Sequence, residues 1–437
     1  MRYKGYKLER RESRKPKGKK FVRLILLLST LGVILYTINI FVFQKPRVKD
    51  LSSLTEIPAH KQVVLKLEPS SGIKQVSVKI FQGQKEVVLY NSAPAKDGTV
   101  RLKIIPKQMG LEDGKAQVLI SLRYGLIGRR TYSVDANIDT VPPTVNLLSY
   151  TEYVPQGGTG AVKVKVKDGA YVYLYVGQDK YPMYPVGNGE FFTLYPVKVD
   201  QDPSTPIRVV AFDNAGNIST LDLKTRIGKG IFRVDRIKLS DEFIDKVIMP
   251  LIGKHLPPAL AFKEVNEVWR KKDVEKLMRI GLGSEGKKLW NGNFLQLPHS
   301  KVISTFGDIR YYYYKGEEIS TSRHMGYDFA SVQESPVPAS NDGVIVFTGK
   351  LGIYGNAVVI DHGLGLMSLY GHLSRVTVKE GQTVKKGDII GNTGSTGLAL
   401  GDHLHFGILV HGIEVNPKEW LDAKWIKTRI ERVFSTQ

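Results

Sequence analysis

The 437-residue sequence contains no cysteine, which excludes disulfide bonds, thiolate metal sites, iron–sulfur clusters and cysteine nucleophiles. Any bound metal must therefore be held by histidine and carboxylate side chains. Acidic residues are also scarce, with 42 Asp and Glu against 63 Lys and Arg, which gives a net charge of +21. Such an excess ordinarily raises nucleic acid as a partner, so the distribution of the charge has to be considered.

The excess positive charge is concentrated at the N-terminus, next to a long uncharged stretch. The first 23 residues carry 11 Lys and Arg and two Glu, and residues 24–43 read LILLLSTLGVILYTINIFVF. Twenty helical residues match the ~30 Å hydrocarbon layer of a bilayer, and the basic side of such a span stays in the cytoplasm. We therefore expect a cytoplasmic tail at residues 1–20, a transmembrane signal anchor at residues 21–43, and no nucleic-acid partner.

This topology places the protein in the cytoplasmic (inner) membrane as a single-pass protein, with its C-terminal domains in the periplasm or on the cell-wall side. The competing interpretation is a cleaved signal peptide. Its apolar region is usually ~7–15 residues long and ends in small residues, whereas this stretch is longer and ends in FVFQKP. A retained anchor fits better.

Residues 50–232 show the period of two that is typical of β-strands. AVKVKVK at residues 161–167 alternates, YVYLYV at residues 171–176 is β-branched and aromatic, and Gly, Asn and Asp clusters separate such runs. The paired prolines in DTVPPTV, residues 139–145, cannot lie in a central strand. We therefore predict two β-sandwich modules, residues 50–139 and 140–232, with surfaces for other envelope proteins. DTVPPTV and AFDNAGN make the second module resemble bacterial immunoglobulin-like modules.

Residues 233–290 change to a helical period. Ser240 is a candidate N-cap before an apolar stripe, and a second helix is expected from Val265, with Asp273 capping a third piece. The stripe consists of Phe243, Ile244, Val247, Ile248 and Leu251. We expect this helical segment to pack on a neighbouring domain.

Seven of the nine histidines lie in the last 139 residues. His403 and His405 belong to HLHFGILV, a predicted strand, in which residues two apart point to the same face. His324 and Asp328 are four residues apart where a loop enters another strand. Two imidazoles and one carboxylate are a known ligand set for catalytic zinc, with water in the fourth position. The sequence has no HExxH motif, so the proton would have to be handled by other histidines, such as His372 and His403.

Several ordered motifs between residues 302 and 416 resemble the lysostaphin-like, LytM-type zinc endopeptidases, which cut peptide bonds in peptidoglycan. The motifs are STFGDIR at 304–310, HMGYDFA at 324–330, GNAVVIDHG at 355–363, YGHLS at 370–374, VKKGDIIG at 384–391 and GDHLHFGI at 401–408. The resemblance implies a C-terminal zinc peptidase domain, residues 291–437, built on an antiparallel β-sheet with a groove on one face.

The same resemblance assigns roles within this domain. It implies one Zn2+ per chain held by His324, Asp328 and His405. His372 and His403 would handle the proton and the developing oxyanion, and peptidoglycan stem peptides would be the substrate. The stretch from Leu398 to Asp402 is a few residues longer than the family pattern, which puts the substrate preference in question.

Taken together, the sequence predicts a mainly β protein and a peptidoglycan endopeptidase. One alternative is a catalytically silent relative that keeps the LytM-type fold and activates a cell-wall amidase. Such relatives typically lose zinc ligands, and this sequence keeps all three. A second alternative, a structural scaffold of an envelope complex, rests only on the sandwich modules.

Overall fold

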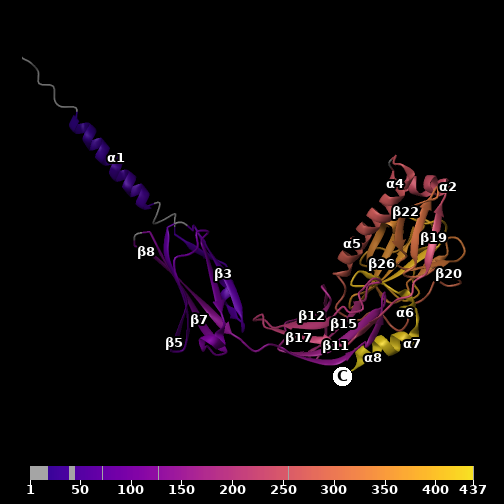
Figure 1. Cartoon of the computed structure of the whole chain (residues 1–437), viewed down its shortest axis with the longest axis horizontal. Helices are drawn as coiled ribbons and strands as arrows, with labels where there is room; N and C mark the ends of the chain where they lie inside the picture. Colours follow the sequence, from indigo (N-terminus) through magenta and orange to yellow (C-terminus); the bar gives the residue numbers. More distant parts are fainter. Residues whose placement is uncertain (1–17, 39–44, 71, 126, 254, 437) are drawn as a thin grey trace, which may run out of the picture. The chain divides into compact units, whose positions relative to one another are not determined.

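The computed structural model describes residues 18–38, 45–70, 72–125, 127–253 and 255–436 (Figure 1). The chain divides into two compact units. Unit 1 contains the chain up to Val141 together with Ala215–Asn217, and unit 2 contains Pro142–Asn214 and Ile218–Gln437. Strands dominate both units, which confirms the expected mainly β fold.

The first helix, α1 (Gly18–Ile38), covers part of the apolar stretch. Among the described residues, no helix is both long and apolar enough to cross a membrane. Residues 39–43 of the expected span, and residues 1–17 of the expected cytoplasmic tail, lie outside the described part of the chain. The transmembrane anchor therefore stays a prediction.

Unit 1 contains two sheets that share one core. Alternate residues of β7 (Gly114–Tyr124), namely Val118, Ile120 and Leu122, are buried, as the period of two predicts. They pack in one cluster with Val63 and Leu65 of β3 (Lys61–Glu68), which lies in the other sheet. The five-stranded sheet has the order β2 (Glu56–Ile57), β8 (Gly128–Ile138), β7, β4 (Ile73–Gln82), β5 (Lys85–Ser92), and the three-stranded sheet has the order β1 (Arg47–Lys49), β3, β6 (Thr99–Ile104).

The first part of unit 2 also contains two four-stranded sheets around a core. One has the order β14 (Tyr184–Gly187), β15 (Glu190–Pro196), β11 (Thr159–Lys167), β9 (Thr144–Tyr150), and the other the order β13 (Asp179–Pro182), β12 (Tyr171–Val176), β16 (Ile207–Phe212), β17 (Ile218–Leu223). This part is not a separate body, because Phe192 and Leu194 of β15 belong to the core of the C-terminal domain. The Trp420 indole N–H also donates a hydrogen bond to Thr159 Oγ1 at 3.2 Å.

The helical segment begins as the sequence predicts. Ser240 Oγ accepts a hydrogen bond from Phe243 N at 3.1 Å, which confirms the N-cap. The next helices start earlier than expected, and Asp273 lies inside α5 and caps no new helix. The helical elements are α2 (Asp241–Phe243), η4 (Ile244–Ile248), α3 (Met249–Ile252), α4 (Pro258–Lys263), η5 (Glu264–Trp269) and α5 (Arg270–Gly281).

The predicted helical segment also contains a strand, β19 (Val234–Leu239), which the sequence does not predict. It pairs in parallel with β21 (Ile309–Tyr314), which pairs with β22 (Glu317–Arg323). Parallel pairing joins segments that are far apart in the sequence, so the period of the segment alone could not reveal it.

The C-terminal domain is built on a sheet in which every neighbouring pair is antiparallel, as expected. Its order is β20 (Lys301–Ser304), β23 (Tyr327–Ala330), β31 (Leu404–Val410), β27 (Leu366–Gly371), β26 (Gly355–Gly363), β25 (Gly343–Leu351), β29 (Thr383–Val384), and β32 (Ile413–Val415) pairs with β31. A small sheet of β24 (Pro336–Pro338), β30 (Ile389–Asn392) and β28 (Arg375–Val376) lies beside it, and α6 (Pro417–Leu421), α7 (Ala423–Trp425), η7 (Ile426–Glu431) and α8 (Arg432–Ser435) end the chain.

Each face of this sheet is covered by a different part of unit 2. The helical segment shares one apolar cluster with the sheet residues Val359, Leu369 and Leu409, so its predicted packing on a neighbouring domain is confirmed. The opposite face packs against β15 and the C-terminal helices. Side chains alternate between the two faces along β31. Leu404 and Phe406 therefore pack on the face covered by β15 and the C-terminal helices, while His405 faces the helical segment.

Two buried carboxylates lie where α5 meets the sheet. Asp273 Oδ2 accepts a hydrogen bond from Ile353 N at 2.8 Å, and Glu414 Oε1 accepts one from the Tyr354 hydroxyl at 2.5 Å. Burial raises the pKa of Asp273 to about 6 and that of Glu414 to about 7, and these hydrogen bonds only partly oppose the effect.

The contribution of Glu414 to the stability of unit 2 should therefore fall as the pH rises. The folded state keeps a proton on Glu414 up to about pH 7, whereas the unfolded chain releases it near its ordinary value of 4.5. The stabilisation is thus fully present below pH 4.5 and is lost as the pH passes 7. We expect the free energy of unfolding of the parent, measured relative to that of Glu414→Gln at the same pH, to drop between pH 5 and 8 by on the order of 1–3 kcal/mol. The comparison with the variant is needed because buried neutral histidines of unit 2, such as His362 and His405, add stability as the pH rises.

Urea unfolding followed by tryptophan fluorescence measures this change in unit 2 alone, because all four tryptophans, at 269, 290, 420 and 425, belong to it. Glu275→Gln makes the same substitution at an exposed position of α5, the helix that packs near Glu414. It is the matched control and should keep the parental pH dependence. An equal slope in Glu414→Gln and the parent would contradict the assignment.

Candidate metal centre and active site

Three residues predicted as metal ligands meet where two strands pair. Asp328 on β23 lies directly opposite His405 on β31 in the antiparallel register. His324 belongs to the short loop between β22 and β23, and its ring contacts that of His405 with centroids 5.0 Å apart. Gly326, between the two ligands of the loop, is required there, because a Cβ at this position would lie 2.6 Å from the His405 ring.

The ligand atoms of the three side chains are close enough to share one cation. His324 Nε2 lies 2.9 Å from Asp328 Oδ1 and 3.2 Å from His405 Nδ1, and His405 Nδ1 lies 3.0 Å from Asp328 Oδ1. A tetrahedral site with Zn–N bonds of ~2.0–2.1 Å has ligand atoms about 3.3 Å apart. Within the described part of the chain, these residues are the one group of at least three His, Asp or Glu side chains that could hold a metal ion.

The hydrogen bonds of His324 support a cation at this point. Its Nδ1 lies 2.9 Å from the Thr305 carbonyl oxygen, which can only accept, so the proton is on Nδ1. When the ring carries only this proton, Nε2 presents a lone pair to the Asp328 carboxylate, which is also an acceptor. Two such lone pairs 2.9 Å apart are the arrangement that ligand atoms adopt around a shared cation, so the residues present fit a metal ion.

The electrostatics keep the ligands in their metal-binding protonation states. Burial raises the pKa of Asp328, but contact with the His324 and His405 rings, when these are protonated, outweighs burial and holds that pKa well below its usual value. Burial lowers the pKa of His405 to about 4, so its ring is neutral at pH 7. His405 Nε2 is buried and has no hydrogen-bond partner among the described residues.

His372 and His403 lie beside this group, as the sequence predicts, and do not belong to it. Their ring centroids are 4.7 Å apart, and His403 Nε2 is 3.7 Å from Asp328 Oδ1. His372 Nδ1 donates to the Thr396 carbonyl at 2.7 Å and His403 Nδ1 donates to the Gly401 carbonyl at 2.8 Å. With one proton on Nδ1 of each ring, Nε2 is left as a proton acceptor.

The backbone holds His372 in an unusual conformation. Its φ is +63°, in the left-handed region that few residues other than glycine adopt. Its N–H donates to the Tyr354 carbonyl at 2.7 Å, and the next N–H, that of Leu373, donates to the Asn356 carbonyl at 3.0 Å. Burial, together with the neighbouring imidazoles, lowers the pKa of His372 to about 3. Such a strained, buried and neutral histidine is typical of a functional position.

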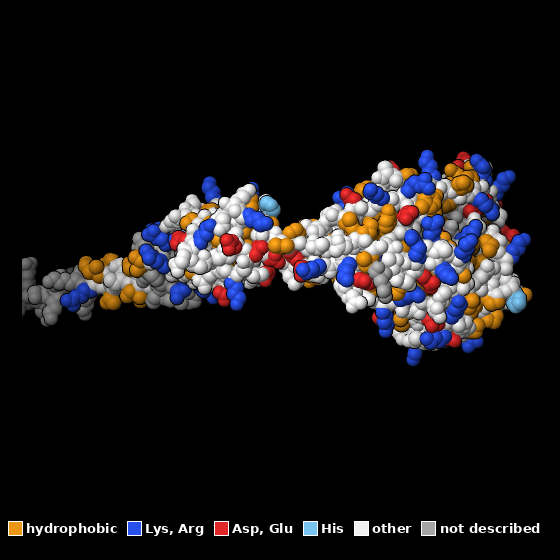
Figure 2. Space-filling model, turned by 90° about the horizontal axis from the view of Figure 1, so that it is seen from below, with side chains coloured by type: hydrophobic (Ala, Val, Ile, Leu, Met, Phe, Trp, Pro, Cys, Tyr) orange, Lys and Arg blue, Asp and Glu red, His pale blue; other side chains and the backbone are white. Residues whose placement is uncertain are grey.

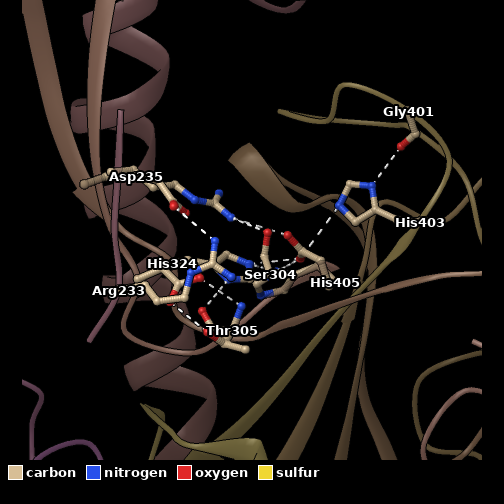
Figure 3. A network of polar contacts seen from close by, with 12 residues as sticks. Arg233, Asp235, Ser304, Thr305, His324, Gly401, His403 and His405 are labelled. Carbon is tan, nitrogen blue, oxygen red and sulfur yellow. Dashed lines mark hydrogen bonds and ion pairs between the residues drawn. The ribbon is translucent and has the colours of Figure 1, made fainter. Parts of the chain in front are cut away.

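All five residues line one cavity of about 490 Å3. Its walls also include Arg310, which lies 3.5 Å from Asp328 Oδ2 and donates to Ser304 Oγ at 3.0 Å. Figure 3 shows His403 approaching the centre from the side opposite His324, with Arg233 and Asp235 across the cavity. The helical segment thus forms one wall of the cavity, and the loop that carries Leu398 to Asp402 forms another.

Several residues around the site have no role predicted from the sequence. Thr305 and Arg310 lie in the quoted STFGDIR motif, so a signal for them was present. Arg233 and Asp235 reach the cavity through the parallel pairing of β19 with β21. The Tyr354 ring, in the short helix between β25 and β26, lies with its centroid 5.1 Å from that of His405. No local sequence pattern predicts these contacts.

Comparison with known proteins agrees with this geometry. Residues 322–417 match Peptidase family M23. The chain is 44% identical over 126 residues to "DD-carboxypeptidase/endopeptidase Mpg" of Neisseria meningitidis serogroup B, covering 29% of this chain and 28% of that protein. It is 47% identical over 93 residues to "Peptidoglycan DD-endopeptidase ShyA" of Vibrio cholerae, covering 21% and 22%. The match thus spans less than a third of these relatives.

Solved structures of similar proteins include a putative peptidase M23 from Pseudomonas aeruginosa, with 20% identity, a TM-score of 0.41 and coverage of 62% of this chain and 95% of that one. The catalytic domain of lysostaphin from Staphylococcus simulans has 31% identity, a TM-score of 0.25 and coverage of 30% and 98%. The predicted family resemblance is confirmed by the sequence match. The C-terminal part of this chain is a domain of peptidase family M23, of the LytM type.

Proposed function

We propose that the protein is a zinc-dependent endopeptidase that hydrolyses peptide crosslinks of peptidoglycan. The observation that carries the proposal is the convergence of His324, Asp328 and His405 on one point of the M23 domain, with two further imidazoles beside it. The relatives named above support the substrate class, because two of them carry peptidoglycan or DD-peptidase activities in their names.

In this proposal His324, Asp328 and His405 hold one Zn2+. The ion would polarise the scissile carbonyl and lower the pKa of a water molecule towards ~7. Three protein ligands leave one position open, as catalytic zinc sites require. Thr305 fixes the orientation of the His324 ring through its carbonyl, and Arg310 fixes that of the Asp328 carboxylate, so both ligands are held before substrate arrives.

His372 and His403 handle the proton. Both rings donate from Nδ1 to a backbone carbonyl, which fixes the tautomer and leaves Nε2 to accept a proton from the attacking water and return it to the leaving amine. After accepting the proton, either imidazolium can stabilise the negative charge that develops on the carbonyl oxygen. His403 is 12% exposed and His372 is buried, so His403 is better placed to exchange its proton with solvent.

The test is to incubate the full chain with isolated crosslinked peptidoglycan and identify the released muropeptides by mass spectrometry. We expect crosslinked dimers to be converted to monomers, and a chelator to stop the conversion. A zinc-loaded protein that releases nothing from any wall type would instead favour the alternative function, a LytM-like regulator that activates a cell-wall amidase.

We also propose that the protein is anchored in the cytoplasmic membrane with unit 2 outside the cytoplasm. The support is the basic bias of residues 1–23 followed by the uncharged residues 24–43. Protease added to intact spheroplasts should remove the M23 domain while a cytoplasmic marker stays intact. If the domain is protected until the membrane is lysed, it lies in the cytoplasm and the proposed topology is wrong.

A further inference from the structure

One end of unit 1 carries a dense group of cations, which we call the basic patch. Figure 2 shows Lys and Arg side chains on the surface at the left end of this unit. A concave surface of about 900 Å3 is lined there by five cations, Lys45, Arg47, Lys49, Arg129 and Arg130, and by one carboxylate, Glu68. All of the cations are exposed except Arg130, which is half-buried. Positive charge thus exceeds negative charge on this surface.

The strand register makes this arrangement unfavourable for folding alone. Arg129 lies directly opposite Arg123 in the β7–β8 pair, and Lys49 lies directly opposite Lys66 in the β1–β3 pair. Like charges at directly opposed positions destabilise a sheet. Such charges are tolerated at low cost on a solvated surface and become favourable when an anion binds between them.

The one carboxylate of the patch is already shared. Glu68 forms ion pairs with Lys49 at 2.5 Å and with Lys66 at 3.7 Å. Glu68 also lies directly opposite Arg47 in the β1–β3 register, but in the described ranges no carboxylate forms an ion pair with Lys45, Arg47 or Arg129. These three cations are therefore available to an external partner that carries several negative charges.

An exposed apolar residue lies next to the patch and indicates which kind of anionic partner fits. Ile127, in the turn between β7 and β8, is 79% exposed and is followed by Gly128, Arg129 and Arg130. A soluble polyanion gains nothing from an exposed isoleucine, whereas a bilayer surface accepts an apolar side chain below a rim of cations. The patch also begins at Lys45, seven residues after the end of the apolar helix α1 at Ile38.

We propose that the basic patch and Ile127 bind the surface of a bilayer that contains anionic phospholipids. The guanidinium and ammonium groups contact headgroup phosphates, and Ile127 enters the headgroup region. This contact is additional to any anchoring by the N-terminal helix and is independent of the proposed peptidase activity. It would hold unit 1 against the membrane, and its strength would fall with increasing salt.

A single fluorescent probe tests the contact in the full chain, which has no native cysteine. Ile127→Cys is labelled with an environment-sensitive dye, and the chain is reconstituted in vesicles of phosphatidylcholine with or without phosphatidylglycerol. We expect a blue shift, and quenching by lipid-borne nitroxide at least about threefold stronger with phosphatidylglycerol, reversed by high salt. Gln84→Cys is the control probe, because the β4–β5 turn lies at the opposite end of the sheet from the β7–β8 turn.

Charge reversal tests the patch itself. Arg47→Glu with Arg129→Glu should abolish the phosphatidylglycerol-dependent quenching, and the milder Arg47→Gln with Arg129→Gln should weaken it if the reversal impairs folding. Lys107→Glu with Lys115→Glu makes the same change of charge at exposed positions outside the patch and should leave the signal unchanged.

Three results would overturn the proposal. The first is equal quenching of the Ile127 probe with and without phosphatidylglycerol, and the second is equal responses of the Ile127 and Gln84 probes. The third is binding of the patch to isolated peptidoglycan with no response to vesicles, which would assign the patch to the wall and not to lipid.

Discussion

Replacing His372 should abolish wall cleavage and leave the metal bound. The ring lies in the candidate active site, where its Nδ1–H donates to Thr396, and it is not one of the three residues whose ligand atoms converge. Loss of a group that accepts and returns the proton costs ~10²–10⁴-fold in rate. We expect His372→Ala to retain about one zinc per chain and to release muropeptides at least ~10²-fold more slowly than the parent.

The backbone conformation of His372 determines how this experiment is controlled. Alanine is disfavoured at a φ of +63°, so His372→Ala could lose activity through altered backbone geometry alone. Asparagine is among the residues that tolerate this conformation, and His372→Asn should be equally inactive with a more nearly native fold. His299→Asn makes the same substitution at an exposed residue with a φ of +52°, outside the cavity, and should be fully active.

The outcomes separate two assignments. If His372→Asn and His372→Ala both cleave wall at the parental rate, the proton is handled elsewhere, and His403 becomes the candidate base. If both variants lose zinc, His372 acts through the metal site, and its assignment as a separate proton carrier is wrong.

The ligand group could be predicted from the sequence because local patterns supply candidate ligands and the family resemblance selects His324, Asp328 and His405 among them. Alternation along LHFGILV places His405 on one face, and the four-residue spacing of His324 and Asp328 across a loop is typical of a pair that converges. What spacing could not give is that Asp328 lies directly opposite His405, because the register between β23 and β31 is set by long-range pairing.

The walls of the cavity could not be predicted for the same reason. The sequence predicts a helical segment where β19 lies, and the parallel pairing of β19 with β21 carries Asp235 to the site. The packing of the second sandwich against the M23 domain could not be predicted either. Its residues, Phe192 of β15 among them, have the apolar pattern that the core of a separate module would also show. Periodicity shows which face of a strand is apolar and does not show what covers that face.

Replacing His405 should remove the metal. Ala at this position deletes one of the three ligand atoms, His405 Nδ1, which lies 3.0 Å from Asp328 Oδ1. Two remaining protein ligands are too few for a structural or catalytic zinc site. We expect His405→Ala to contain less than about a tenth of the parental zinc, by elemental mass spectrometry after dialysis, and to show no wall cleavage.

The loss of zinc should also remove a ligand-dependent stabilisation. A metal that binds only the folded state stabilises it by about 2.7 kcal/mol when present at 100 times its dissociation constant. The parent should therefore unfold at a higher urea concentration with zinc than with a chelator, in the tryptophan signal of unit 2. His405→Ala should unfold at the same urea concentration with zinc as with a chelator. Unit 1 contributes no tryptophan and is monitored separately by circular dichroism.

A matched control is needed because removing any buried histidine can disturb the sheet. His411 directly follows β31 and is also buried, but its Nε2 hydrogen-bonds to Thr193 Oγ1 and the Leu194 carbonyl on the opposite side of the sheet from the metal site. His411→Ala should lose stability and yet bind about one zinc per chain. If His405→Ala keeps its zinc, or if both variants lose it equally, the loss does not report ligation, and the assignment of His405 as a ligand fails.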